Sequence, residues 1–246
     1  LVFASTDSRK LVKSTNTTIK SGIKAGIIIH KKVAAILKAA HFPTGFYRGG
    51  CEPLSARIFV DGAPVDPVLL TQAADALAAG KPLPRAAAEL AAAARCFGAV
   101  GCKLAVVELA DAGLASALPK MPVCAVTAIG SDGVSRSIER SAALAAGVMR
   151  EGATCVTAPE QPKPALSELI VAAGKANCEL VVPDPEDITF LDAEKLNSKV
   201  DYGGYPVPLT FLGRHAVGNA AIAVELALAL WRKGFDIADE AILEGL

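Results

Sequence analysis

The sequence lacks an excess of either charge and has few aromatic residues. Among its 246 residues, 25 are Lys or Arg and 25 are Asp or Glu, so the formal net charge is zero. Domains that bind nucleic acids usually carry a clustered excess of positive charge, so a nucleic-acid partner is not expected. Aromatic residues make up only 5% of the chain, and the hydrophobic content of 52% therefore comes mainly from small and aliphatic side chains.

Long hydrophobic runs are also absent. A membrane-spanning helix needs about 20 mainly apolar residues, and no stretch of the sequence reaches that length. The opening residues, LVFASTDSRKLVK, lack the long apolar segment of a secretory signal peptide. We therefore expect a cytoplasmic protein without a membrane partner. Because the first residue is Leu1 and not Met, the sequence can be a trimmed product.

Metal-binding and redox motifs are missing as well. The three histidines, His30, His41 and His215, are far apart and show no metal-ligand spacing. No two cysteines form a CxxC pair, and most lie in apolar runs such as PVCAVTAIG. This pattern favours buried, reduced thiols over a disulfide, which is the alternative. The six cysteines are Cys51, Cys96, Cys102, Cys124, Cys155 and Cys178.

The sequence does contain apolar runs that alternate with amphipathic helices. Short continuous apolar runs are typical of strands buried on both faces, and they lie at residues 103–108, 123–129, 154–157 and 179–182. Apolar residues at helical spacing predict helices at residues 20–40, 66–80, 84–101, 137–152 and 164–178. Strands that alternate with helices indicate right-handed βαβ units. The predicted class is therefore α/β, with a mainly parallel sheet flanked by helices.

Three further segments complete the predicted order of elements. Residues 56–66 read as two short strands joined by a turn at Asp61 and Gly62. Residues 183–208 are rich in Pro, Asp and Gly and read as a linker. A late strand at residues 207–213 is followed by a long helix.

Carboxylates follow two of the predicted parallel strands, at the edge where such sheets bind ligands. Glu108 and Asp111 follow the first of these strands, and Asp132 follows the second. A carboxylate at such a position can hold a metal ion bound to phosphates. The alternative is a loop carboxylate that caps the next helix, and it is the stronger interpretation, most clearly for Asp111.

Three stretches resemble a known family in their order of apolar positions. They are VAAILKAAHFPTGFY followed by ARIFVDGAPVD, then AAAELAAAARCFGAVGCKLAVVEL, and finally PLTFLGRHAVGNAAIAVELALALWRKGFDIADEAILEGL. Together they resemble the central domain of the Mur ligase family, most closely folylpolyglutamate synthase and dihydrofolate synthase. The resemblance implies a P-loop-NTPase-like Mur ligase central domain over residues 1–246, with the family's C-terminal ligase domain absent after Leu246.

The phosphate loop of that family, G-T-N-G-K-G-S, matches poorly. In the family its glycines let backbone N–H groups approach phosphate, its Lys reaches the outer phosphates, and its hydroxyl binds Mg²⁺. The candidates here are KSTNTT at residues 13–18 and SGIKAGII at residues 21–28, and neither contains Gly-Lys-Ser or Gly-Lys-Thr. The second is a degenerate phosphate loop that keeps Gly22 and has Lys24 and Gly26 nearby. We expect a long helix over residues 20–40, with Ile27, Ile28 and Ile29 largely buried, in place of a glycine cradle.

Other catalytic motifs of the family are also reduced. The acidic motif keeps Glu108 and Gly113 but loses its Arg and its second acid. The Asp-His pair reads Asp132-Gly133, and the Glu-Lys-Ala-Gly motif reads Leu-Ala-Ala-Gly at residues 144–147. The resemblance therefore leaves Glu108 and Asp132 as candidate metal ligands.

The G-x-H-x-x-x-N turn of the family is present, with His215 and Asn219 at its polar positions. In the family the Asn lies near the adenine base, so these two residues are candidates for nucleotide binding. The alternative, which we favour, is that Asn219 caps the following helix and His215 forms hydrogen bonds in a loop.

Core positions thus match the family, whereas most polar catalytic positions do not. We interpret the chain as a domain that has lost ATP-dependent ligase activity and acts as a non-catalytic binding or interaction subunit, in a homodimer or with a second protein. No cofactor is expected under that interpretation. One alternative is a divergent amide ligase that binds ATP and Mg²⁺ through Glu108, Asp132, His215 and Asn219. Another small-molecule role in the same cleft also remains open.

Overall fold

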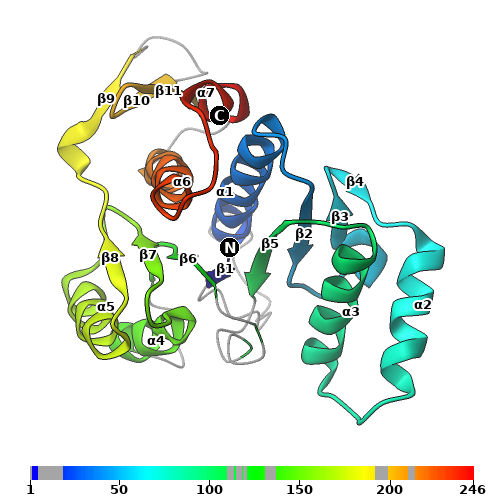
Figure 1. Ribbon diagram of the computed structural model, residues 1–246. Helices are drawn as coiled ribbons and strands as arrows, with labels where there is room; N and C mark the ends of the chain where they lie inside the picture. The colour runs from blue at the N-terminus through cyan, green and yellow to red at the C-terminus, as the bar shows by residue number, and fades with distance from the viewer. Residues whose placement is uncertain are drawn as a thin grey trace.

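A mostly parallel sheet of eight strands runs through the middle of the protein, in the order β4-β3-β2-β5-β1-β6-β7-β8 (Figure 1). In the computed structural model, residues 2–4, 19–109, 114, 118, 121–130, 137–191, 199–209 and 214–246 are described, without the side chains of residues 2–4, 19–28 and 214–215. The strands are β1 (Val2–Ala4), β2 (Thr44–Arg48), β3 (Ile58–Val60), β4 (Ala63–Pro64), β5 (Leu104–Leu109), β6 (Val123–Val126), β7 (Thr154–Thr157) and β8 (Glu179–Val181). The predicted α/β class is confirmed, and the four predicted parallel strands are β5, β6, β7 and β8.

Helices cover both faces of this sheet. One layer holds α1 (Ile19–Ala39), α6 (Arg214–Arg232) and α7 (Asp239–Gly245). The opposite layer holds α2 (Pro67–Ala78), α3 (Arg85–Ala99), α4 (Ile138–Ala145) and α5 (Lys163–Ala176). Short 3-10 helices lie at η1 (Leu54–Ala56), η3 (Ala146–Val148) and η4 (Pro185–Asp187). The predicted helix at residues 137–152 is thus shorter than expected, and its last turns are η3 and a turn.

Side chains of the central strands alternate between two apolar cores, because successive residues of a strand point to opposite faces. In β5, Val106 packs in the core beneath α1 and α6, whereas Val107 and Leu109 pack in the core beneath the opposite layer. This alternation places Glu108 on the same face as Val106, toward α1. The sheet therefore presents one acidic side chain of β5 to the layer that contains α1 and α6.

The predicted long helix over residues 20–40 is confirmed as α1. Its apolar positions at helical spacing, Ile29, Val33, Ile36 and Leu37, are at most 1% exposed. The expected burial of Ile29 is confirmed, whereas the side chains of residues 27 and 28 lie outside the described part.

The predicted hairpin at residues 56–66 is confirmed as β3 and β4. Asp61 and Gly62 both have positive φ, 48° and 85°, as a two-residue hairpin turn requires. The Asp61 carboxylate also accepts a hydrogen bond from the backbone N–H of Thr44 at 2.8 Å. This bond attaches the turn to the first residue of β2.

The prediction of a linker at residues 183–208 is wrong. This segment contains β9 (Ile188–Phe190), β10 (Lys199–Tyr202) and β11 (Tyr205–Pro208), which form a separate antiparallel sheet. Val200, Tyr202 and Val207 of this sheet are buried against α6. The strands are short and contain polar residues, so the sequence shows no clear alternation of apolar and polar positions. The Pro and Gly content of the segment therefore led to the prediction of a linker. Of the predicted late strand at residues 207–213, residues 207 and 208 belong to β11, and residues 210–213 lie outside the described part.

The six cysteines all lie in the described part of the chain, and no disulfide joins them. The expected burial is found for Cys96, Cys124, Cys155 and Cys178. Cys51 is exposed, in contrast to the buried position expected for most of the others. Among the helices that the structure describes, none is long and apolar enough to cross a membrane.

Candidate functional site

The candidate site lies at the point in the sheet from which the chain adds strands first on one side and later on the other. From β1 the chain passes through α1 to β2, on one side of β1, whereas from β6 it passes through α4 to β7, on the other side. The two crossover helices lie on opposite faces of the sheet. Open α/β sheets bind ligands outside the carboxyl ends of the strands at such a switch point. The carboxyl ends of β1, β2, β5 and β6 therefore define the place to look for functional residues.

Glu108 stands at this edge, near the end of β5. It pairs in register with Phe3 of β1 on one side and with Arg48 of β2 on the other. Its side chain is 14% exposed, and its Oε2 atom lies 3.5 Å from Nδ1 of His30 on α1. The described neighbour of this candidate metal ligand is thus a histidine and not a second carboxylate.

His30 is buried beneath the sheet edge, with 1% of its surface exposed. Burial lowers the pKa of His30 to about 3, and the positive charge of Arg48 contributes to the same shift. The imidazole is therefore neutral at physiological pH. The centroid of the His30 ring lies 5.9 Å from that of Phe46 on β2, so the imidazole also has an aromatic neighbour. Glu108 consequently faces an uncharged imidazole and gains no countercharge from it.

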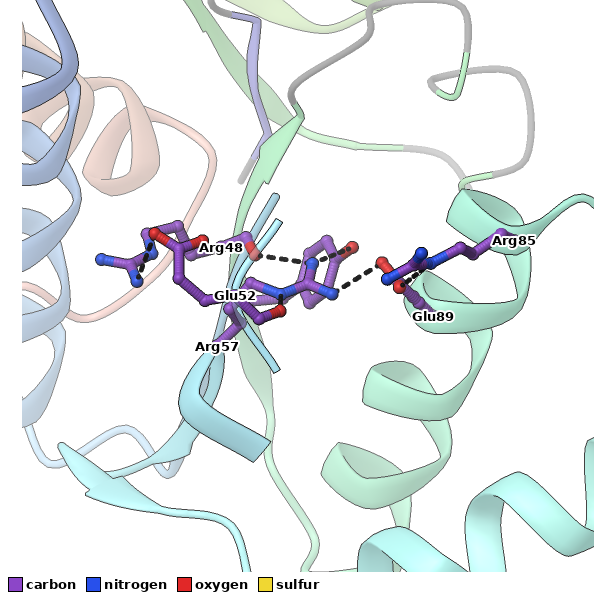
Figure 2. A network of polar contacts seen from close by, with 6 residues as sticks. Arg48, Glu52, Arg57, Arg85 and Glu89 are labelled. Carbon is purple, nitrogen blue, oxygen red and sulfur yellow. Dashed lines mark hydrogen bonds and ion pairs between the residues drawn. The ribbon is translucent and has the colours of Figure 1, made fainter. Parts of the chain in front are cut away.

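Arg48 supplies the positive charge at this edge. It is the last residue of β2, and its guanidinium forms an ion pair with Glu52, with Nη2 and Oε1 3.6 Å apart. Figure 2 shows this pair on the side of the strand that faces α1. Its side chain is 24% exposed, so it is accessible to solvent but held by its neighbours.

A buried arginine on the other side of β2 fixes the loop that carries Glu52 (Figure 2). Nε of Arg57 donates to the backbone carbonyl of Glu52 at 2.8 Å, and Nη1 donates to that of Arg48 at 3.4 Å. The same guanidinium forms an ion pair with Glu89 of α3, at 2.8 Å between Nη2 and Oε2. Glu89 also pairs with Arg85 at 2.9 Å. The loop after β2 is thus tied to α3 through a buried charge.

On the other side of β1, Gln161 holds the ends of β6 and β7 together. Its Nε2 atom donates to the carbonyl of Thr127 at 2.9 Å and to the hydroxyl of Thr157 at 2.8 Å. Its Oε1 atom accepts a hydrogen bond from the backbone N–H of Ile129 at 3.0 Å. The segment that leads toward Asp132 is therefore anchored at residues 127–129.

Asn219 approaches the same edge from α6. Its side chain is 5% exposed, and it is the sixth residue of the helix that begins at Arg214. The expectation that Asn219 caps this helix is therefore wrong, because the helix begins five residues earlier. A Cβ on the preceding Gly218 would lie 3.4 Å from the ring of Pro159, just beyond β7. Asn219 is thus near the end of β7, which is three strand spacings, or about 14 Å, from β5.

Solved structures of other proteins share this architecture. A folylpolyglutamate synthase from Thermotoga maritima aligns with a TM-score of 0.73 and 20% identity, covering 89% of this chain and 54% of that chain. The Mycobacterium tuberculosis folylpolyglutamate synthase, solved with ADP and AMPPCP, aligns with a TM-score of 0.74 and 18% identity, covering 99% and 57%. The Escherichia coli protein FolC, solved with DHPP and ADP, aligns with a TM-score of 0.73 and 18% identity, covering 99% and 56%.

The chain has the fold of a folylpolyglutamate synthase. It spans between 54% and 57% of the length of the three proteins above. The resemblance expected from the sequence is therefore confirmed for the fold, and fold alone does not establish activity. No protein-family model matches the sequence, and no curated protein matches it.

The degenerate phosphate loop falls within a helix of this folylpolyglutamate synthase fold. The backbone of Gly22, Lys24 and Gly26 belongs to α1, which begins at Ile19. Inside an α-helix each N–H donates to the carbonyl four residues earlier, so the amides of residues 24 and 26 already have partners. The other candidate, at residues 13–18, lies outside the described residues, as do Asp111 and Asp132. For His215 the backbone lies in the first turn of α6, and its side chain is not described.

The resemblance to folylpolyglutamate synthase implies a divalent cation, and the described residues do not fit one. Mg²⁺ prefers an octahedral set of oxygen ligands, and Glu108 is the acidic side chain that the structure places at the end of β5. Among the described residues, its neighbours include a neutral imidazole and the register partner Arg48, which is a cation. Within the described part of the chain, no group of three or more His, Cys, Asp or Glu side chains is arranged to hold a metal ion.

Sequence reasoning missed His30, Arg48 and Gln161 as residues of this edge. Arg48 and Glu108 become neighbours only through the register of β2 and β5, which are far apart in the sequence. His30 lies on the apolar face of a helix. In the sequence it is a single polar residue among apolar positions, and nothing there indicates that it contacts Glu108. The Gly-Gly pair after Arg48 was the one available signal, because it marks the end of the strand.

Proposed function

We propose that this chain is a folylpolyglutamate-synthase-like domain that acts as a binding or interaction subunit and does not catalyse ATP-dependent ligation. The observation that carries the proposal is the position of α1 beside Glu108. A phosphate cradle that shares a metal ion with Glu108 must lie within a few ångströms of its carboxylate. At that level α1 presents His30, eleven residues after the helix begins.

The helical backbone at this position has no free donors for a phosphate. Phosphoryl transfer depends on positioning and on neutralisation of charge by backbone N–H groups, a Lys and Mg²⁺. Near His30 the helix amides donate to helix carbonyls. Within the described part of the chain, Arg48 is the register partner of Glu108 and brings a positive charge to this edge, and it forms an ion pair with Glu52. These features support a domain that binds a partner or ligand but does not catalyse phosphoryl transfer.

The test is an assay of ADP formation with Mg²⁺, ATP, L-glutamate and a folate. We expect no turnover above a protein-free control. Turnover that is abolished by Glu108→Ala and retained by Glu160→Ala would contradict the proposal. Glu160 is an exposed carboxylate beyond β7 and is the matched control.

One alternative function has a specific observation in its favour. Glu108 and the buried Asn219 stand at the same edge of the sheet, at the positions that the resemblance assigns to metal and adenine binding. A divergent ATP-dependent amide ligase would use them with Asp132 and His215. The assay above separates this alternative from the main proposal, because only the alternative predicts ADP formation.

We also propose that residues 1–246 form a single Mur-ligase-like central domain that works with a partner, as a homodimer or with a second subunit. The support is that several large apolar side chains are exposed, and a partner that covers them would remove apolar surface from water. Trp231 is 59% exposed, Phe190 63% and Leu191 53%. Light scattering tests the proposal. A monomer near 25.2 kDa, with no partner recovered by affinity capture, would contradict it.

A further inference from the structure

We propose that Cys124 and Cys155 form a redox-sensitive pair, which a small peroxide oxidises to a disulfide in the folded protein. The inference goes beyond the proposed function, because it concerns the core beneath α4 and α5 and not the candidate site. In the structure both cysteines are free, so the structure represents the reduced form.

The two thiols come from neighbouring strands and stand side by side. Cys124 of β6 and Cys155 of β7 are register partners in a parallel pair, and both side chains pack in the same apolar core. Adjacent strands lie about 4.8 Å apart, and the Cα atoms of a disulfide are usually about 4.4–6.8 Å apart. A hydrogen bond with the Cys155 thiol also raises the pKa of Cys124. A bond between the two sulfur atoms therefore requires only a small movement of the strands.

Cys178 is the competing partner for this bond. It comes just before β8, and its thiol forms a hydrogen bond with that of Cys124, which raises the pKa of Cys178. However, β7 lies between β6 and β8, and two strand spacings are about 9.6 Å, beyond the limit of about 7 Å between the Cα atoms of a disulfide. Cys155 pairs with Leu180, so Cys178 is its diagonal neighbour, at about 7–8 Å. The register of the sheet therefore favours the bond between Cys124 and Cys155.

The oxidation has two steps, and hydrogen peroxide is the oxidant. In the first step the thiolate of one cysteine attacks the peroxide, the O–O bond breaks, and a sulfenic acid and hydroxide form. The hydroxide takes up the proton that the thiol released and becomes water. In the second step the sulfur of the other cysteine attacks the sulfenic sulfur, the S–O bond breaks, and a second water leaves. Two thiols and one peroxide thus give one disulfide and two waters.

Burial makes this pair slow to react. Cys124 and Cys155 are both 0% exposed, and the raised pKa of Cys124 leaves little of the reactive thiolate. A peroxide therefore reaches the pair during local opening of the layer that covers it, which contains α4 and α5. The pair should respond to sustained oxidation and remain reduced during a brief exposure.

The test is prolonged incubation of the folded protein with hydrogen peroxide, followed by alkylation of the remaining thiols in denaturant, digestion with trypsin and mass spectrometry. Arg150 lies between Cys124 and Cys155 in the sequence, and Lys175 lies between Cys155 and Cys178, so the three thiols fall in separate peptides. We expect a cross-linked pair of peptides that contains Cys124 and Cys155 and separates on addition of dithiothreitol. Circular dichroism verifies that the protein stays folded during the incubation.

Variants identify the partner of Cys124. Cys155→Ala should lose the cross-link, whereas Cys178→Ala should keep it. Cys96→Ala, which removes another buried thiol of the same core, is the matched control and should also keep it. Absence of the cross-link in the folded, treated wild type would overturn the inference, as would a main product that joins Cys124 to Cys178. Because the incubation contains no nucleotide or folate, its outcome is separate from the assay of ligase activity.

Discussion

His30, Arg57 and Glu89 are polar or charged side chains set into an apolar interior, and they are accommodated in two ways. An uncompensated charge is costly to bury. His30 avoids the cost by remaining neutral, whereas Arg57 keeps its charge and pairs with Glu89. These arrangements make stability depend on pH and on single side chains.

His30 should make the protein less stable as the medium becomes acidic. Its pKa is about 3 in the folded protein, against an ordinary value of 6.5. As the pH falls below 6.5, the unfolded chain takes up the proton first, so the free energy of unfolding decreases by up to about 1.4 kcal/mol per pH unit. Urea unfolding between pH 7.5 and 5 should therefore show a shallower pH dependence for His30→Leu than for the wild type.

The control for this experiment is His41→Asn. His41 is exposed at the end of α1 and has a positive φ of 60°, which Asn tolerates. This variant should keep the pH dependence of the wild type. An unchanged pH dependence in His30→Leu would show that His30 is not buried as a neutral group.

The ion pair between Arg57 and Glu89 gives a second prediction. Burial alone would raise the pKa of Glu89, but hydrogen bonds and charges from Arg57 and Arg85 outweigh it and hold that pKa below its ordinary value. A depressed carboxyl pKa stabilises the fold above the unfolded pKa, and this contribution is lost as the pH falls through the folded pKa. Glu89→Gln should cost about 3–5 kcal/mol at pH 7, because it leaves Arg57 buried without its partner.

Chemical denaturation at pH 7 and at pH 3.5 measures this effect. The difference between Glu89→Gln and the wild type should shrink at the lower pH, because below the ordinary pKa of 4.5 the unfolded chain takes up a proton at Glu89 before the folded protein does. Glu160→Gln, at an exposed position, should have little effect at either pH. A loss below about 1 kcal/mol in Glu89→Gln at pH 7 would argue against a buried pair, because exposed ion pairs have effects of that size.

At the level of secondary structure, close packing between elements depends on individual glycines. A Cβ on Gly45 of β2 would lie 2.4 Å from the ring of Phe97 on α3. That distance is shorter than any normal contact, so the ring can pack this close to the strand only because position 45 has no side chain. On Gly98, the next residue of α3, a Cβ would meet nothing within 4 Å.

The two glycines should therefore respond in opposite ways to the same substitution. Gly45→Ala should destabilise the protein by about 1–3 kcal/mol through overpacking. Gly98→Ala should be neutral or stabilise it by up to about 1 kcal/mol, because Ala favours a helix over Gly. Thermal unfolding measures both. If the clash is with Phe97, the additional change Phe97→Leu should recover part of the loss in Gly45→Ala, and a purely additive double variant would refute that explanation.

The sequence predicts the long elements well and the short ones poorly. Helix α1 and strands β5 to β8 have continuous apolar faces, so their periodicity is visible without tertiary information. Strand β1 has only three residues, and β9 to β11 lie in a segment rich in Pro and Gly. Their pairing partners stabilise them, and a linear pattern does not contain those partners. The same limit applies to the site. The sequence predicts that Glu108 lies at the end of a strand, but it does not show that Arg48 is its neighbour, because that depends on the register of β2 and β5.

At the scale of the whole molecule, the fold is shared with folylpolyglutamate synthases, whereas we propose that the surroundings of Glu108 do not bind phosphate and metal strongly. The structural likeness extends over nearly the whole chain at 16% to 20% identity. Apolar core positions can preserve a fold at this level because hydrophobicity and size are the main requirements. Phosphate binding requires particular backbone and charged groups. The central claim is therefore that the fold has been kept without a strong nucleotide site.

Calorimetric titration with Mg²⁺ and ATP tests that claim most directly. With α1 helical beside Glu108, we predict a dissociation constant no tighter than about 1 mM, which corresponds to about −4 kcal/mol. Neither Glu108→Ala nor Asn219→Ala should weaken binding further. Micromolar, Mg²⁺-dependent binding of ATP that weakens at least about tenfold, or 1.4 kcal/mol, on either substitution would contradict the account and favour the divergent ligase.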